Sequence, residues 1–71
     1  MNYLSSNLKY LRNKKNISLA KLGVIFNKTR TTIFRWENGT REPCIDDLIK
    51  LSKFYNINID KLLKVDLTKG V

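Results

Sequence analysis

Arg30 and Arg35 are the side chains whose spacing offers the clearest chemistry in this sequence. A guanidinium can donate two hydrogen bonds to the O6 and N7 atoms of guanine, and it binds phosphate equally well. Thr31 and Phe34 lie between the two arginines, and either side chain could contact the methyl group of a thymine. Taken alone, two arginines are more often solvated surface charges. Their chemistry depends on a helix that brings all four side chains to one face.

The net charge of the chain is concentrated in its first part. The sequence has 71 residues, with 14 Lys and Arg against six Asp and Glu, for a net charge of +8. Residues 1–41 hold nine basic residues and a single acid, Glu37, whereas residues 42–71 hold five of each sign. A polyanion is therefore the expected partner of residues 1–41.

The composition argues against an enzyme. There is no His, so catalytic dyads built on His and His-ligated zinc sites are excluded. The single cysteine, Cys44, can form neither an internal disulfide nor a multi-cysteine metal site. The carboxylates fall mainly at expected helix starts. We therefore expect no catalytic residues, no metal, no cofactor and no small-molecule ligand.

No segment of the sequence is typical of a membrane protein. The longest apolar stretch, residues 22–26, is far shorter than the roughly 18 residues that a membrane span needs. Residues 1–6 lack the charged start and apolar core of a signal peptide. We expect a cytoplasmic protein that forms one domain over residues 1–71.

Helical periodicity dominates the chain, which predicts an all-α fold. Short polar residues mark the expected helix starts: Ser5 or Ser6, Ser18, Thr29, Cys44 and Asn58. Three asparagines mark expected stops, because Asn tolerates a left-handed turn. Between these signals we predict a first helix that ends near Lys15 and four further helices over residues 19–26, 30–37, 45–55 and 59–64. No segment alternates for long enough to predict a strand.

The expected third helix carries Arg30, Thr31, Phe34 and Arg35. Advancing about 100° per residue places Ile33 and Trp36 toward the core. The opposite arc then holds a threonine, an exposed aromatic ring and the two arginines. In the helix before it, Leu22, Ile25 and Phe26 share one face, and Gly23 predicts a close approach by another helix. Two helices joined by the tight turn at Asn27 form a helix-turn-helix pattern.

Two stretches of the sequence resemble a known family. Residues 17–39 include the run Thr32-Ile33-Phe34-Arg35-Trp36-Glu37-Asn38-Gly39, and residues 43–63 place Pro43, Ile45, Leu48 and Leu51 before Tyr55-Asn56-Ile57-Asn58-Ile59-Asp60-Lys61-Leu62-Leu63. The pattern resembles the phage-repressor helix-turn-helix family (Cro/cI type, also called Xre) over about residues 5–64. The resemblance implies a compact five-helix bundle, with residues 65–71 as a C-terminal tail.

The resemblance also implies roles for individual residues. The third helix would lie in the major groove of DNA, with base-reading positions at Arg30, Thr31 and Arg35 and a possible apolar contact at Phe34. Arg12 and Glu37 would form a structural ion pair. Phosphate-contacting positions would fall on Ser18, Lys28, Thr29, Asn38, Thr40 and Arg41.

The sequence departs from the family pattern at four positions. Leu19 stands where many members have a glutamine that contacts phosphate, which removes a hydrogen-bond donor from the expected DNA face. Gly23 replaces an alanine, Asn27 replaces the glycine of the turn, and Cys44 replaces the usual Ser or Thr cap. We expect Cys44 to be an inert substitute at that position.

The function that the resemblance implies is sequence-specific binding of double-stranded DNA by a bacterial or phage-encoded transcriptional regulator, expected to be a repressor. A homodimer on a palindromic operator is expected, with half-sites roughly 34 Å apart. The neutral second part of the chain would supply the dimer seam. An antitoxin or a protein-interaction module with the same fold remains the alternative. Candidate seam residues are Leu62, Leu63, Val65 and Leu67.

Overall fold

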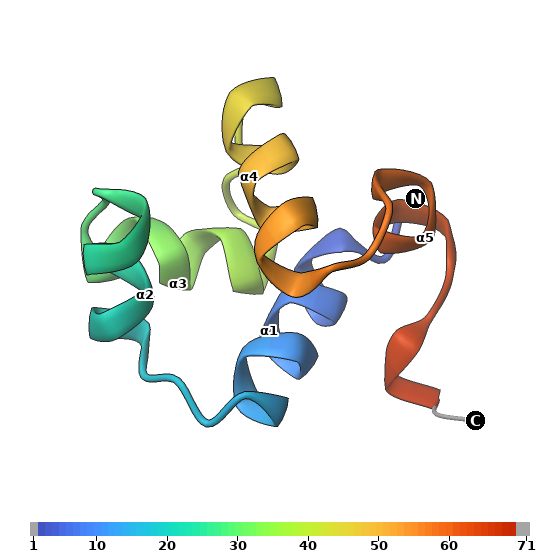
Figure 1. Ribbon diagram of the computed structural model, residues 1–71, viewed down its shortest axis with the longest axis horizontal. Helices are drawn as coiled ribbons and strands as arrows, with labels where there is room; N and C mark the ends of the chain where they lie inside the picture. Colours follow the sequence, from blue (N-terminus) through green and yellow to red (C-terminus); the bar gives the residue numbers. More distant parts are fainter. Residues whose placement is uncertain (1, 70–71) are drawn as a thin grey trace.

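A computed structural model describes residues 2–69, which contain α-helices and one 3₁₀ turn but no strand (Figure 1). The predicted all-α fold with five helices is confirmed. The helices are α1 (Leu4–Lys14), α2 (Leu19–Phe26), α3 (Arg30–Asn38), α4 (Ile45–Tyr55) and α5 (Ile59–Lys64), and the 3₁₀ turn η1 (Leu67–Lys69) follows them.

Three helices begin at side-chain caps of the predicted kind. Ser18 Oγ accepts a hydrogen bond from Lys21 N at 3.0 Å, and Thr29 Oγ1 accepts one from Thr32 N at 3.1 Å. At the start of α5, Asn58 Oδ1 accepts a hydrogen bond from Lys61 N at 2.7 Å. These bonds satisfy backbone N–H groups that have no partner within their helix, which is why α2, α3 and α5 start where the sequence predicts.

The predicted start of α1 is wrong. The helix begins at Leu4, so Ser5 and Ser6 both lie inside its first turn. Asn2 Oδ1 accepts a hydrogen bond from Leu4 N at 3.0 Å and supplies the polar partner instead. Tyr3 N donates to Leu63 O at 2.8 Å, which places the residue before α1 beside α5 (Figure 1).

Asparagine ends several segments, as predicted. Asn16, Asn27 and Asn56 all have positive φ, between 54° and 57°. In each case the left-handed residue reverses the chain after a helix, a conformation that costs Asn less than most other residues. Gly39, with φ of 82°, does the same after α3.

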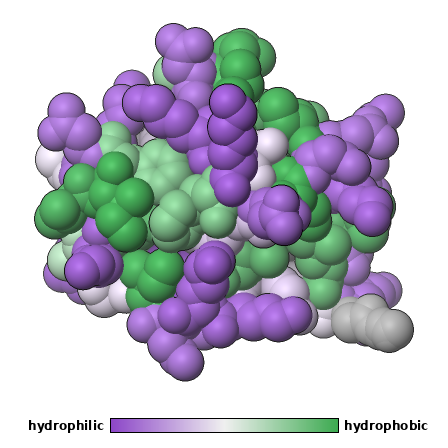
Figure 2. All heavy atoms as spheres, in the orientation of Figure 1, coloured by the Kyte–Doolittle hydropathy of each residue, from purple (hydrophilic) through white to green (hydrophobic). Residues whose placement is uncertain are grey.

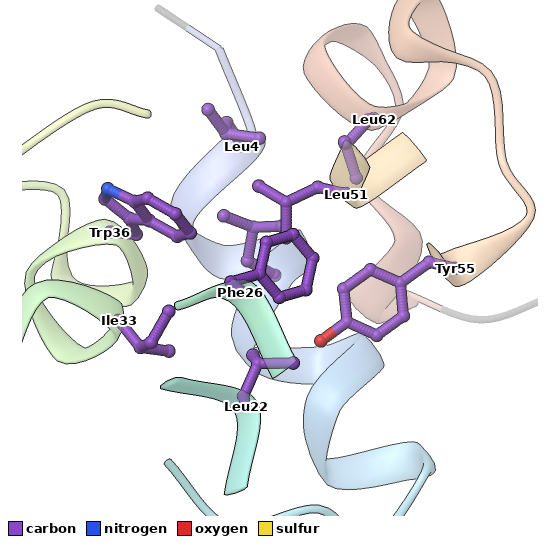
Figure 3. Close-up of a cluster of buried hydrophobic side chains, with 9 residues drawn as sticks. Leu4, Leu22, Phe26, Ile33, Trp36, Leu51, Tyr55 and Leu62 are labelled. Atoms are coloured by element: carbon purple, nitrogen blue, oxygen red, sulfur yellow. The ribbon is translucent and has the colours of Figure 1, made fainter. Parts of the chain in front are cut away.

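All five helices contribute to one hydrophobic core (Figure 3). The Phe26 ring forms T-shaped contacts with Trp36 and Phe54, with ring centroids 6.2 and 5.6 Å away, an arrangement that aromatic pairs favour. The core therefore fixes α2 against both α3 and α4. Its buried members are Leu4, Leu8, Leu22, Phe26, Ile33, Trp36, Leu51, Tyr55 and Leu62.

Ile25 does not join this core, although it was predicted to share one face of the helix with Leu22 and Phe26. Its side chain is 45% exposed, because the core-facing arc of α2 is narrow and is filled by Leu22 and Phe26. Ile25 instead borders a surface hollow that Lys50 and Lys53 of α4 also line. Figure 2 shows apolar side chains among hydrophilic ones on the face of the molecule that is turned toward the viewer in Figure 1.

Asn7 is a buried polar residue that ties α5 and the segment after it to α1. Its Nδ2 donates to Leu62 O and Val65 O at 2.8 and 2.7 Å, and its Oδ1 accepts from Leu67 N at 3.0 Å. The side chain is fully buried, and so is that of Leu62. Leu62 is therefore part of the core and is not available to the dimer seam for which it was a candidate.

Candidate nucleic-acid interface

The turn between α2 and α3 is built on a close backbone approach at Gly23. Lys28 N donates to Gly23 O at 2.8 Å, which folds the chain back toward α2. A Cβ atom at Gly23 would lie 2.8 Å from Lys28 O and 3.3 Å from Arg30 N. The close approach that Gly23 predicted is thus made by the turn and the first residue of α3. It fixes the angle at which α3 leaves the turn.

Replacing Gly23 with alanine is expected to destabilise the domain by about 1 kcal/mol, although alanine is the better helix former. The added methyl group forces the turn to shift, and such overpacking costs roughly 1–3 kcal/mol. The gain in helix propensity, about 1 kcal/mol, offsets only part of that cost. Urea unfolding measures the difference. The exposed Ala20→Gly change in the same helix is the control for propensity alone, and a Gly23→Ala protein more stable than wild type would contradict the account.

One face of α3 is open to solvent and carries the predicted reading residues. Arg30, Thr31 and Arg35 are all exposed, and the Phe34 side chain is 52% exposed. On the opposite face, the inward residues of α3 are fully packed in the core. The structure therefore brings the four side chains onto one exposed arc of a single helix. An arc of this kind offers hydrogen-bond donors and apolar groups, and base edges in the major groove can contact both.

The cap residues of α2 and α3 are exposed polar residues next to this arc. Ser18 Oγ is used as an acceptor by Lys21 N, so its own hydroxyl proton remains available to a phosphate oxygen. Thr29 Oγ1 accepts from Thr32 N and also lies 3.0 Å from Thr32 Oγ1. Both residues are exposed. Each of these helix starts also presents backbone N–H groups, which favour anions.

The loop after α3 is held in place by the last turn of that helix. Arg35 O accepts hydrogen bonds from Gly39 N, from Thr40 N at 3.2 Å and from Arg41 N at 3.3 Å. Thr40 Oγ1 donates to Asn38 Oδ1 at 2.7 Å, which orients the amide of Asn38. The NH₂ group of Asn38 and the guanidinium of Arg41 make no hydrogen bond within residues 2–69. Two predicted phosphate-contacting residues therefore remain free to bind.

Lys28 is placed differently from the other predicted phosphate contacts. Its Nζ lies 3.3 Å from Asp47 Oδ2 in the first turn of α4. Asp47 is buried, and its Oδ2 also accepts a hydrogen bond from Cys44 Sγ at 3.4 Å. Cys44 is the N-cap residue of α4, but its side chain makes no hydrogen bond to the backbone there. Sequence reasoning missed this pair because it joins segments nineteen positions apart. Lys28 braces the turn against α4, and a phosphate would have to compete with Asp47 for it.

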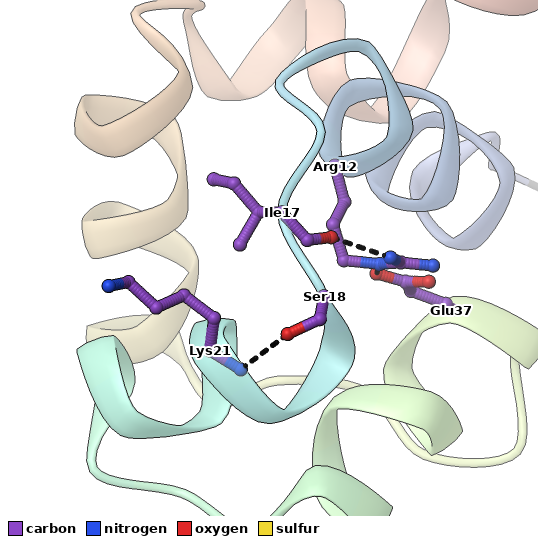
Figure 4. Close-up of polar contacts among 5 residues, drawn as sticks. All are labelled: Arg12, Ile17, Ser18, Lys21 and Glu37. Carbon is purple, nitrogen blue, oxygen red and sulfur yellow. Dashed lines mark hydrogen bonds and ion pairs between the residues drawn. The ribbon is translucent and has the colours of Figure 1, made fainter.

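Arg12 and Glu37 form an ion pair that joins α1 to the end of α3 (Figure 4). Arg12 Nε donates to Glu37 Oε2 at 2.8 Å, and Arg12 Nη1 donates to Ile17 O at 2.8 Å. The side chains are only 13% and 5% exposed. One guanidinium thus holds α1, the segment before α2 and the end of α3 together, which sets the position of the exposed arc.

The hydroxyl group of Tyr55 points into the core (Figure 3), where Tyr55 Oη has no hydrogen-bond partner within the described part of the chain. Burial raises the pKa of Tyr55 to about 12. The carboxylate of Glu37 adds to this rise in pKa, and the charge of Arg12 opposes it. The folded protein therefore holds this proton more tightly than the unfolded chain does.

Replacing Tyr55 with phenylalanine is expected to alter how stability depends on alkaline pH. In wild type, the unfolded chain loses the phenolic proton near pH 10, whereas the folded protein keeps it to about pH 12. The unfolded state binds fewer protons in this range, so the free energy of unfolding falls as pH rises. Tyr55→Phe lacks this contribution, and below pH 10 it should be as stable as wild type or more so, because an unpaired buried hydroxyl is removed.

Urea unfolding of both proteins at pH 8 and pH 11 checks the Tyr55 prediction. Every other titratable group is present in both proteins, so the difference between the two isolates Tyr55. An equal loss of stability in the two proteins on going to pH 11 would count against it.

The described residues contain neither a candidate metal site nor a candidate membrane span. No group of three His, Cys, Asp or Glu residues is arranged to hold a metal ion within residues 2–69. No helix there is long and apolar enough to cross a membrane.

Comparisons with known proteins find a helix-turn-helix family and a transcriptional regulator. The model of the family described as "Helix-turn-helix" matches residues 8–62. The HTH-type transcriptional activator BcrR of Enterococcus faecalis is 38% identical to this chain over 56 residues. That match covers 79% of this chain and 28% of the relative, so the chain spans less than a third of the length of the curated protein that it resembles.

Proposed function

Because this chain belongs to the helix-turn-helix family of the Cro/cI (Xre) type, we propose that it binds a specific double-stranded DNA sequence and regulates transcription there. The observation that carries the proposal is the exposed arc of α3, where two arginines project beside a threonine and a half-exposed phenylalanine. Arg30, Thr31 and Arg35 read base edges. Phosphates are held by the flanking residues Ser18, Thr29, Asn38, Thr40 and Arg41, with Lys28 shared with Asp47.

The expected DNA-bound form is a homodimer on a palindromic site. One α3 spans only a few base pairs, and two copies related by a two-fold axis double the length that is read. The surface for this contact lies in residues 42–71, where equal numbers of acidic and basic residues avoid like-charge repulsion. Val65, which is 45% exposed, and the partly buried Leu63 and Leu67 remain candidates for the seam.

Repression is the direction of regulation that we propose. A domain that occupies a promoter blocks polymerase by its presence alone, whereas activation needs a further favourable contact with the transcription machinery. The relative in Enterococcus faecalis is named as an activator, so transcription in vitro from a promoter carrying the selected site decides between the two. A fall in transcript with added protein supports repression, and a rise contradicts it.

Selection of bound duplexes from a random DNA library tests the proposed binding function. The expected result is enrichment of one motif with two-fold symmetry, and a particle mass that corresponds to two chains on each duplex. Enrichment of an asymmetric motif with one chain bound would retain DNA recognition and reject the dimer. Absence of any enriched motif would reject sequence-specific binding.

A further inference from the structure

An apolar hollow opens on the proposed DNA face between the start of α2 and the exposed arc of α3. Its volume is about 280 Å³, and its lining residues are Leu19, Arg30, Thr31 and Phe34. A second hollow lies beside it, above the ion pair of Arg12 and Glu37, and Leu19 and Phe34 line that one too. The two side chains therefore stand together between the hollows and form an apolar wall on an otherwise polar face.

The surroundings of this wall favour nucleic acid as the occupant of the first hollow. Arg30 is one of its lining residues, and the net charge of +8 lies within residues 1–41, which contain every residue of the lining. A basic lining residue attracts a polyanion, whereas the side chains of Leu19 and Phe34 give no hydrogen bond to it. The matching group must be an apolar group that belongs to a polyanion. In the major groove, the C5-methyl group of a pyrimidine, which thymine carries, is the apolar feature of the base edges.

We propose that Leu19 and Phe34 form a receptor for the C5-methyl group of a thymine, and that this contact helps to set the DNA sequence that the protein selects. The inference rests on the proposed function and deepens it. Leu19 cannot donate a hydrogen bond to phosphate, but from the same position it supplies the second wall of the hollow. Phe34 is 52% exposed before DNA is bound, so the contact removes apolar surface from water on both sides.

Substitution of thymine by deoxyuridine tests this contact with wild-type protein. Each thymine of the selected site is replaced in turn, which removes one methyl group and leaves base pairing unchanged. Loss of one buried methyl group corresponds to about a fourfold weaker Kd. The expected result is such a loss at one position in each half-site. Replacing that T·A pair with C·G and then with 5-methylcytosine·G shows whether the methyl group restores binding when another base carries it.

Variants connect the methyl effect to the two residues. Phe34→Ala and Leu19→Gln should each reduce the preference for thymine over deoxyuridine at that position to nearly onefold. Val24→Ala is the matched control, because it shortens an apolar side chain of α2 that is 78% exposed and does not line the hollow. The control should keep the wild-type preference.

Each outcome decides the inference. Wild-type protein that binds every deoxyuridine duplex within 1.5-fold of the thymine duplex overturns it, and so does a preference that survives in both variants. In either case sequence-specific binding would still stand, so the two failures can be told apart. A library without any selected site overturns the proposed function and this inference with it.

Discussion

Replacing Glu37 with alanine is expected to destabilise the domain by about 3–5 kcal/mol, because it leaves the charge of Arg12 without its partner. The Arg12 side chain is only 13% exposed, so water cannot replace the lost carboxylate. Domains of this size have stabilities of about 5 kcal/mol, so most of the variant should be unfolded near physiological temperature. Urea unfolding followed by circular dichroism at 10 °C measures the change.

Two comparisons show whether this loss comes from the stranded charge. Asp60→Ala breaks the ion pair with Lys64, whose side chains are both 74% exposed, and should change stability by less than about 0.5 kcal/mol. The double variant Arg12→Met, Glu37→Leu removes both buried charges and should be more stable than Glu37→Ala alone. An effect of Glu37→Ala no larger than that of Asp60→Ala would contradict the role of the pair.

Replacing Arg35 with alanine is expected to weaken binding to the selected DNA site by about five- to a hundredfold, with Arg30→Ala giving a loss in the same range. A bidentate contact between a guanidinium and guanine accounts for about 1–3 kcal/mol of base discrimination. Both side chains are exposed and form no ion pair within the described residues, so their removal should leave folding intact. Fluorescence anisotropy at a fixed salt concentration measures the Kd of each variant.

A lysine from the neutral part of the chain provides the control for the arginine variants. Lys50→Ala removes one positive charge from α4, away from the arc of α3, and should weaken binding by less than about threefold through long-range attraction. If the two arginine variants bind no more weakly than Lys50→Ala, the arc is not the reading surface.

Helix boundaries in this chain are predictable because the signals that set them are local. Ser18, Thr29 and Asn58 satisfy N–H groups three residues ahead, and Asn27 and Asn56 adopt the left-handed turn themselves. None of these contacts requires knowledge of another helix. The start of α1 was mispredicted because two adjacent serines offered equally good caps, while Asn2 supplied the partner from outside the helix.

Long-range contacts could not be inferred in the same way. The bonds of Asn7 to Leu62 and Val65 join positions 55 and 58 residues apart, and nothing in the local pattern distinguishes Asn7 from a surface asparagine. The partner of Lys28 depends on how α4 lies against the turn. Ile25 has the correct helical spacing for the core, but its exposure depends on the width of the contact between α2 and its neighbours.

The candidate site also combines a feature that local sequence predicts with one that depends on long-range packing. The arc of α3 follows from helical periodicity, because an advance of about 100° per residue places Ile33 and Trp36 on the inward side of the helix and the arginines outside it. The apolar hollow does not follow from it, since Leu19 and Phe34 belong to different helices and meet only through the packing of α2 on α3. The departure of Leu19 from the family pattern was the available signal.

The most direct test of the claim that the arc of α3 reads bases is a specificity profile of the selected site. Every position of the site is changed to each of the other three base pairs, and Kd is measured for wild type and for Arg35→Ala at one salt concentration. The account predicts that the variant binds all four base pairs nearly equally at one position of each half-site and keeps its preferences elsewhere. A profile parallel to that of wild type, weakened uniformly or unchanged, would contradict base reading by Arg35.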